Sequence, residues 1–225
     1  QGALQSAYLA LEEELRRFFA SDAPAKVSCT SSDIYANEHG SPLWYLGFED
    51  CGERQAFRVH AARPQRQPWP SPSLEALWLR LMRALRRALD LLLCASLGPG
   101  ALDFADEDSS VMFALYYPAG RDGSNGGSGG RAPLAVGEHV DRSLLVAEPC
   151  CGVDGLEVYD EAARDWIGVE ASLEHGRDVV VFAGQALSAA TRGTVSGLRH
   201  RVRRSTAPRV CCIYELKLDA LMPQR

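Results

Sequence analysis

The sequence lacks any long apolar run, and its N-terminus lacks the basic segment and apolar core of a signal peptide. Hydrophobic residues make up 46% of the 225 residues, but none of their runs reaches the roughly 20 residues that a membrane-spanning helix needs. These absences argue against a membrane protein and against secretion. We therefore expect a cytoplasmic protein with no membrane partner.

A surplus of positive charge is absent as well. The 24 Lys and Arg residues are outnumbered by 29 Asp and Glu residues, which gives a net charge of −5 and a pI near 5.6. This balance argues against a general affinity for nucleic acids or anionic membranes, although local arginine clusters leave a nucleic-acid or protein substrate open. The length suits one well-buried core, and we expect a single domain over residues 1–225 and a monomer.

Metal-binding cysteine motifs are also missing. The seven cysteines include no CxxC pair and no zinc-finger spacing. Their number is odd, and two pairs are adjacent, Cys150–Cys151 and Cys211–Cys212. We therefore predict free thiols in a reducing compartment.

Apolar residues at helical spacing predict two helices that flank the rest of the chain. The first covers Ala3 to Phe19, and the second covers Ser71 to Leu97, with Ser71 as the cap and Pro72 at the first helical position. The apolar stripe of the second helix is expected to consist of Leu74, Leu77, Leu81, Leu85, Ala88 and Leu92.

Most of the remaining apolar runs are short and separated by turn residues. The expected strands are Ser28–Ala36, Leu43–Phe48, Val111–Pro118, Leu144–Ala147, Leu156–Tyr159, Trp166–Val169, Val179–Phe182 and Val210–Leu218. Many short strands joined by turns are typical of a jelly roll or barrel. We expect a mainly β chain in which residues 1–110 form a mixed, partly helical support and residues 111–218 form the β core. The Gly/Ser-rich residues 120–130 predict a loop, whose role as a lid, a plain connection or an engineered joint stays open.

Three residues in this β region suit a metal site. His139 and Asp141 are two positions apart, which on a strand places both side chains on one face. His200 follows another strand-like run. Two imidazoles and one carboxylate form the facial triad of non-haem Fe(II) oxygenases, which leaves coordination positions open for substrate and O2.

The motifs around the triad occur in a recognisable order. After His139-x-Asp141 come Gly155-Leu156-Glu157-Val158, Trp166, the apolar run Asp178–Gly184, His200-Arg201-Val202 and Arg209. This order resembles the 2-oxoglutarate/Fe(II)-dependent dioxygenases of the isopenicillin N synthase-like type. The resemblance implies a double-stranded β-helix (jelly-roll) core, Fe(II) bound by the triad, and 2-oxoglutarate and O2 as cosubstrates. It leaves a role for ascorbate open.

The resemblance also implies which residues bind 2-oxoglutarate. Arg209 is expected to pair with the distal carboxylate, for which a guanidinium is a suitable two-pronged donor. Tyr117 is expected to contact the same molecule, and Cys211 occupies the serine position of the family's Arg-x-Ser motif. The chain departs from the family at two positions. Cys211 puts a weak thiol donor where the family has a serine hydroxyl, and Leu115 in place of the family's asparagine removes one expected polar contact.

Together, these features predict an oxidoreductase that hydroxylates or demethylates an unidentified substrate and converts 2-oxoglutarate to succinate and CO2. A small molecule is the expected substrate, with a peptide side chain or a nucleic-acid base as alternatives. Two further readings stay open. One is an Fe(II) oxidase of the same fold that does not use 2-oxoglutarate, and the other is a catalytically inactive binding module.

Overall fold

The computed structural model describes residues 2–36, 42–97, 109–120 and 133–217. Its helical segments are α1 (Ala3–Ala20), α2 (Ala23–Val27), η1 (Pro64–Arg66), α3 (Pro72–Leu97), η2 (Glu170–Ser172) and α4 (Gln185–Ala190). Both predicted helices, α1 and α3, are confirmed. Almost all of the predicted loop at residues 120–130 lies outside the described residues.

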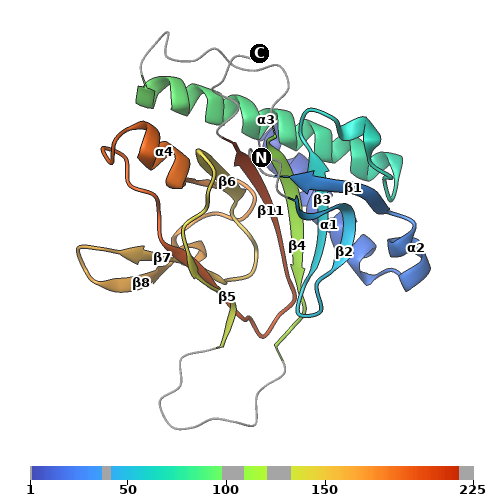
Figure 1. The fold of residues 1–225 in the computed structure, drawn as a ribbon. Helices are drawn as coiled ribbons and strands as arrows, with labels where there is room; N and C mark the ends of the chain where they lie inside the picture. Colours follow the sequence, from blue (N-terminus) through green and yellow to red (C-terminus); the bar gives the residue numbers. More distant parts are fainter. Residues whose placement is uncertain (1, 37–41, 98–108, 121–132, 218–225) are drawn as a thin grey trace.

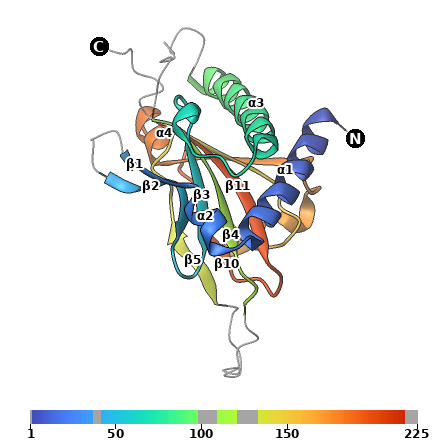
Figure 2. The ribbon, with the colours of Figure 1, turned by 90° about the vertical axis from the view of Figure 1, so that its right-hand side faces the viewer.

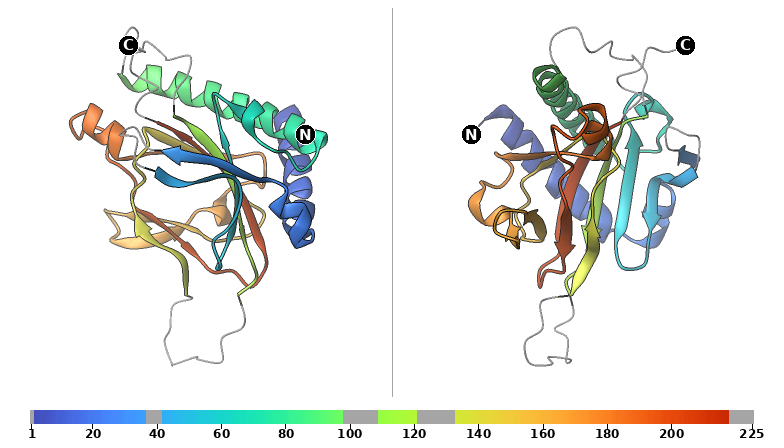
Figure 3. Two further views of the ribbon diagram at one scale, coloured as in Figure 1. Left: turned by 45° about the vertical axis from the view of Figure 1, so that its right-hand side comes forward. Right: turned by 60° about the vertical axis from the view of Figure 1, so that its left-hand side comes forward.

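The strands form two antiparallel sheets (Figure 1). The major sheet has the order β1 (Thr30–Ala36), β2 (Pro42–Asp50), β3 (Gln55–His60), β4 (Val111–Tyr117), β11 (Arg209–Leu216), β6 (Leu145–Pro149) and β9 (Val179–Ala183). The minor sheet has the order β5 (Leu134–His139), β10 (His200–Arg203), β7 (Leu156–Asp160) and β8 (Asp165–Gly168). The hairpin β7–β8 and the strands β1–β3 lie on opposite sides of β11 (Figures 1 and 3).

The two faces of the major sheet have different environments, because side chains alternate along each strand. Met112 and Ala114 on β4, and Cys212 and Tyr214 on β11, belong to the buried cluster that includes α1 and α3. The alternate residues on the same strands line a cavity that faces the minor sheet. The helices therefore support the major sheet from one side and leave the other side for the cavity.

Helices α1 and α3 pack against each other and lie on the same side of β4 and β11 (Figure 2). The α3 N-terminus is capped as predicted, since the Leu74 backbone N–H donates to Ser71 Oγ at 3.1 Å. Trp78 on α3 is fully buried and meets the Phe57 ring edge-on at 5.4 Å. None of the described helices is apolar enough over its length for a bilayer crossing.

The buried face of α3 differs from the predicted stripe near the helix end. Ala88 is exposed and Leu92 is 44% exposed, whereas Leu89 and Leu93 are fully buried. The contact face rotates along the helix, as expected where a straight helix crosses a twisted sheet. The helix prediction is confirmed, but the last part of its stripe was wrong.

Candidate metal and cosubstrate site

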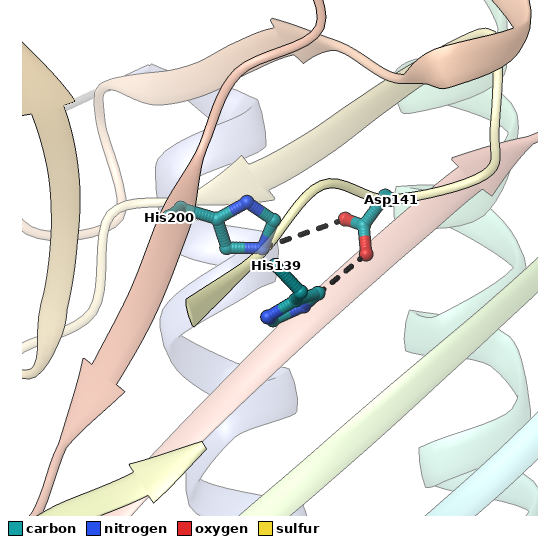
Figure 4. Close-up of side chains that lie close together, drawn as sticks. All are labelled: His139, Asp141 and His200. Atoms are coloured by element: carbon teal, nitrogen blue, oxygen red, sulfur yellow. Dashed lines mark ion pairs between the residues drawn. The ribbon is translucent and has the colours of Figure 1, made fainter. Parts of the chain in front are cut away.

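The three predicted metal ligands come together at one edge of the minor sheet (Figure 4). Strand β5 ends at His139 and β10 begins at His200, and these two residues are direct partners in the antiparallel register. Their ring centroids are 4.2 Å apart. Asp141 was expected on the strand, but it lies two residues past the end of β5, where the chain turns its carboxylate back toward the rings.

The geometry of these side chains suits one metal ion. Asp141 Oδ1 is 3.4 Å from His139 Nε2, and Asp141 Oδ2 is 3.6 Å from His200 Nε2. The ligand atoms of all three residues lie within 4.8 Å of one another. The Nδ1 atoms are 2.8 Å from the Gly137 carbonyl and 3.2 Å from the Leu198 carbonyl. Backbone oxygens in these positions favour protonated Nδ1, which leaves both Nε2 atoms available as ligands.

The electrostatics favour the ligand forms of the carboxylate and of one imidazole. Burial favours neutral Asp141, but hydrogen bonding to His139 and the nearby His200 outweigh it and lower the carboxyl pKa. Burial lowers the pKa of His200, whereas the hydrogen bond to Asp141 raises the pKa of His139. An ionised carboxylate and a neutral imidazole are the forms that bind a divalent cation, so the residues present fit Fe(II).

The triad opens into a cavity of about 280 Å³ between the two sheets. Apolar side chains form much of its wall: Phe113, Leu115, Val136, Val146, Leu156, Phe182, Val202 and Ile213. Tyr117 also lines the cavity, and its predicted contact with 2-oxoglutarate stays a prediction. Leu115 leaves an apolar surface where the resembled family has an asparagine.

Arg209 does not line this cavity. It is only 2% exposed, and its Nη2 atom donates to Glu148 Oε1 at 2.7 Å and to Glu170 Oε1 at 3.0 Å. Its Nε atom donates to the Val153 carbonyl at 3.2 Å. The Arg209 side chain passes over Gly155, where an added Cβ would lie 3.0 Å from Arg209 Cδ. The predicted role of Arg209 in binding 2-oxoglutarate therefore stays a prediction, and its guanidinium already has two carboxylate partners.

Cys211 follows Arg209 by two residues and pairs with Leu115 across β11 and β4, but it does not line the cavity. It is 1% exposed and packs with Cys151 and Leu115. Its role as a cosubstrate contact also stays a prediction.

Four charged residues line the cavity that the sequence did not single out: Arg54, Arg58, Glu148 and Glu215. Arg58 forms an ion pair with Glu49, and Glu215 forms one with Lys217. Charged residues within apolar strands, such as Glu148 in β6 and Glu215 in β11, were a signal that could have indicated them.

No sequence-family model matches the chain, and a search of curated protein sequences found no match. Solved structures do match. The dioxygenase for auxin oxidation from rice is 21% identical with a TM-score of 0.74, and the match covers 94% of this chain and 69% of that one. This chain therefore shares the fold of that structure.

Two further matched structures contain 2-oxoglutarate. A full-length Neurospora crassa protein in complex with alpha-KG is 17% identical with a TM-score of 0.75, covering 95% of this chain and 72% of that one. JOX2 in complex with 2OG, Fe and JA is 19% identical with a TM-score of 0.62, and the match covers 100% of this chain and 68% of that one. The predicted mainly β fold, with a double-stranded β-helix core and flanking helices, is confirmed.

Proposed function

We propose that this protein is an Fe(II)- and 2-oxoglutarate-dependent dioxygenase that hydroxylates or demethylates a small molecule. The observation that carries the proposal is the triad, whose three ligand atoms converge at a cavity between the two sheets. The fold shared with proteins that were solved with alpha-KG or with 2OG and Fe supports the same assignment.

Each part of the site has a role in this proposal. His139, Asp141 and His200 would hold Fe(II) through two Nε2 atoms and a carboxylate oxygen. When bound, iron with 2-oxoglutarate and O2 supplies the oxidising chemistry, with succinate and CO2 as products. The apolar wall keeps bulk water from the reacting groups, and the two backbone carbonyls fix the orientation of the rings.

The cavity supports a small-molecule substrate. Its volume of about 280 Å³ and its mostly apolar wall suit a compact ligand rather than a folded macromolecule. The matched structures include the Neurospora crassa protein with thymine and JOX2 with JA, both of which are small ligands. We infer a substrate of similar size, bound beside the triad.

A second candidate is an Fe(II) oxidase of the same fold that does not use 2-oxoglutarate. Three observations favour it: Leu115 and Cys211 replace polar residues of the resembled family, and Arg209 is already paired with Glu148 and Glu170. Substrate oxidation that proceeds at the same rate without 2-oxoglutarate would select this candidate.

The test measures metal and cosubstrate binding in His139→Ala and in a matched control, His60→Ala, which removes an imidazole outside the cavity wall. Without oxygen, we expect wild type and the control to bind Fe(II) and then to develop a weak visible absorption band when 2-oxoglutarate is added. His139→Ala should lose more than about 100-fold in metal affinity, because it lacks a direct ligand rather than a supporting group. A wild type that binds Fe(II) but forms no band would contradict the use of 2-oxoglutarate.

A further inference from the structure

Among the described residues, the cavity contains a guanidinium without a carboxylate partner, and it is not that of Arg209. We propose that Arg54 receives the distal carboxylate of 2-oxoglutarate in this protein. The inference rests on the proposed function, and it assigns the cosubstrate contact to a residue outside the motifs of the resembled family.

Arg209 is poorly placed to bind a further anion. Its single positive charge lies between Glu148 and Glu170, and all three side chains are almost fully buried. A third carboxylate would leave two surplus negative charges in a region of low dielectric, where unpaired charges cost several kcal/mol. Of these three residues, only Glu148 lines the cavity, so an anion bound in the cavity would meet this carboxylate as well.

The strand register places Arg54 in the same row as Tyr117 and Arg209. Tyr117 pairs with Arg209 across β4 and β11, and Tyr116 pairs with Gln55 across β4 and β3. Arg54 immediately precedes Gln55, so the same register brings it beside Tyr117 on the side away from Arg209. Paired residues of an antiparallel sheet project from the same face, and both Arg54 and Tyr117 do line the cavity.

The Arg54 side chain has unused hydrogen-bonding capacity. Its Nε atom is buried and has no hydrogen-bond partner among the described residues. Its backbone is fixed by the tight turn between β2 and β3, where the Cys51 N–H donates to the Arg54 carbonyl at 2.9 Å. The other arginine of the cavity, Arg58, is ion-paired with Glu49.

These features match the needs of a bound 2-oxo diacid. When such an acid is held at the triad by its 2-oxo-acid end, its second carboxylate requires a cation with hydrogen-bond donors to spare. Arg54 lines the same cavity as the triad and meets that requirement. Tyr117 in the same row offers a hydroxyl beside it.

The test compares Arg54→Gln with Arg66→Gln, which removes the charge of an exposed arginine outside the cavity. Two acids are titrated calorimetrically into Mn(II)-loaded protein: 2-oxoglutarate, and 2-oxopentanoate, in which a methyl group replaces the distal carboxylate. We expect Arg54→Gln to weaken 2-oxoglutarate binding about 10- to 100-fold, the loss typical of one charge-assisted contact. Its affinity for 2-oxopentanoate should stay within about twofold of wild type, and Arg66→Gln should bind both acids normally.

The outcomes separate this inference from the proposed function. Unchanged 2-oxoglutarate affinity in Arg54→Gln overturns the inference alone and leaves the proposed function standing. Equal losses for both acids also overturn it, because they would show damage to the metal end of the site. A wild type that binds Mn(II) but neither acid overturns the proposed function, and the inference with it.

Discussion

Arg209 lies between two carboxylates, whereas Glu157 lies between two guanidinium groups. The inner cluster consists of Arg209, Glu148 and Glu170. Glu148 lines the cavity, and each side chain of the cluster is at most 6% exposed. The outer cluster consists of Glu157, Arg201 and Arg203 on β7 and β10. Its Arg203 side chain is 42% exposed, so the surplus charge of that cluster reaches water.

The two clusters differ in whether solvent reaches the surplus charge, and this difference sets the free-energy cost of that charge. In the outer cluster, the guanidinium of Arg201 lies 4.0 Å from the Trp166 ring, and solvent screens Arg203. In the inner cluster, the extra negative charge sits on side chains that water does not reach. Burial raises the pKa of Glu148 despite the attraction of Arg209. The inner cluster is therefore the more fragile of the two, and the difference can be measured.

Removing the central residue of the inner cluster should have the largest effect. Arg209→Met leaves two buried carboxylates without a cation, and we expect the free energy of unfolding to fall by about 3–5 kcal/mol. Urea denaturation measures it. The control Arg177→Met removes an arginine whose side chain is 63% exposed, and should stay within about 0.5 kcal/mol of wild type. A loss below about 1 kcal/mol for Arg209→Met would remove the distinction between the clusters.

Removing the central residue of the outer cluster should cost less. Glu157→Gln loses the 2.6 Å ion pair with Arg201 and the 3.0 Å ion pair with Arg203, and we expect a loss of about 1–2 kcal/mol. Arg203→Gln, which removes the exposed partner, should cost at most about 1 kcal/mol. Added salt should reduce the contribution of Arg203 to the free energy of unfolding more than it reduces the contribution of Arg201. If Glu157→Gln and Arg209→Met lose the same free energy of unfolding, the inner cluster is not the more fragile of the two.

The smallest effect is a change in the pH dependence of stability. Because the pKa of Glu148 is higher in the folded state than its ordinary value of 4.5, the folded state binds more protons just above that pH. Wild-type stability should therefore fall as the pH rises through the folded-state pKa. Glu148→Gln should lack this pH dependence. The stability of wild type relative to the variant should therefore increase when the pH is lowered from neutral to acid. Glu174→Gln, at an exposed site, should leave the slope unchanged.

Local patterns predicted the elements whose periodicity is strong. Helices α1 and α3 follow from their apolar spacing, and β4 and β11 follow from their apolar runs. Strand β3 was missed because its mixed sequence shows no alternation, and its place depends on pairing with β2 and β4. Helix α4 was missed because its six residues are too few to show a helical periodicity.

The metal-ligand part of the candidate site was predictable from the sequence. His139, Asp141 and His200 follow from residue type and order, and the structure brings their ligand atoms together. The partners of Arg209 were not predictable, because Glu148 and Glu170 lie on separate elements and meet Arg209 only after the sheets form. The same holds for Arg54, whose place beside Tyr117 depends on strand register.

Strand β11 lies between β4 and β6, so it joins the two halves of the major sheet although the ribosome makes it after every other strand of that sheet. Any sheet that β1 to β4 or the pair β6–β9 forms before residues 209–216 are made has an open edge where β11 later pairs. All three triad residues precede this strand. The nascent chain thus carries its metal ligands before it carries the strand that joins the two halves of the major sheet.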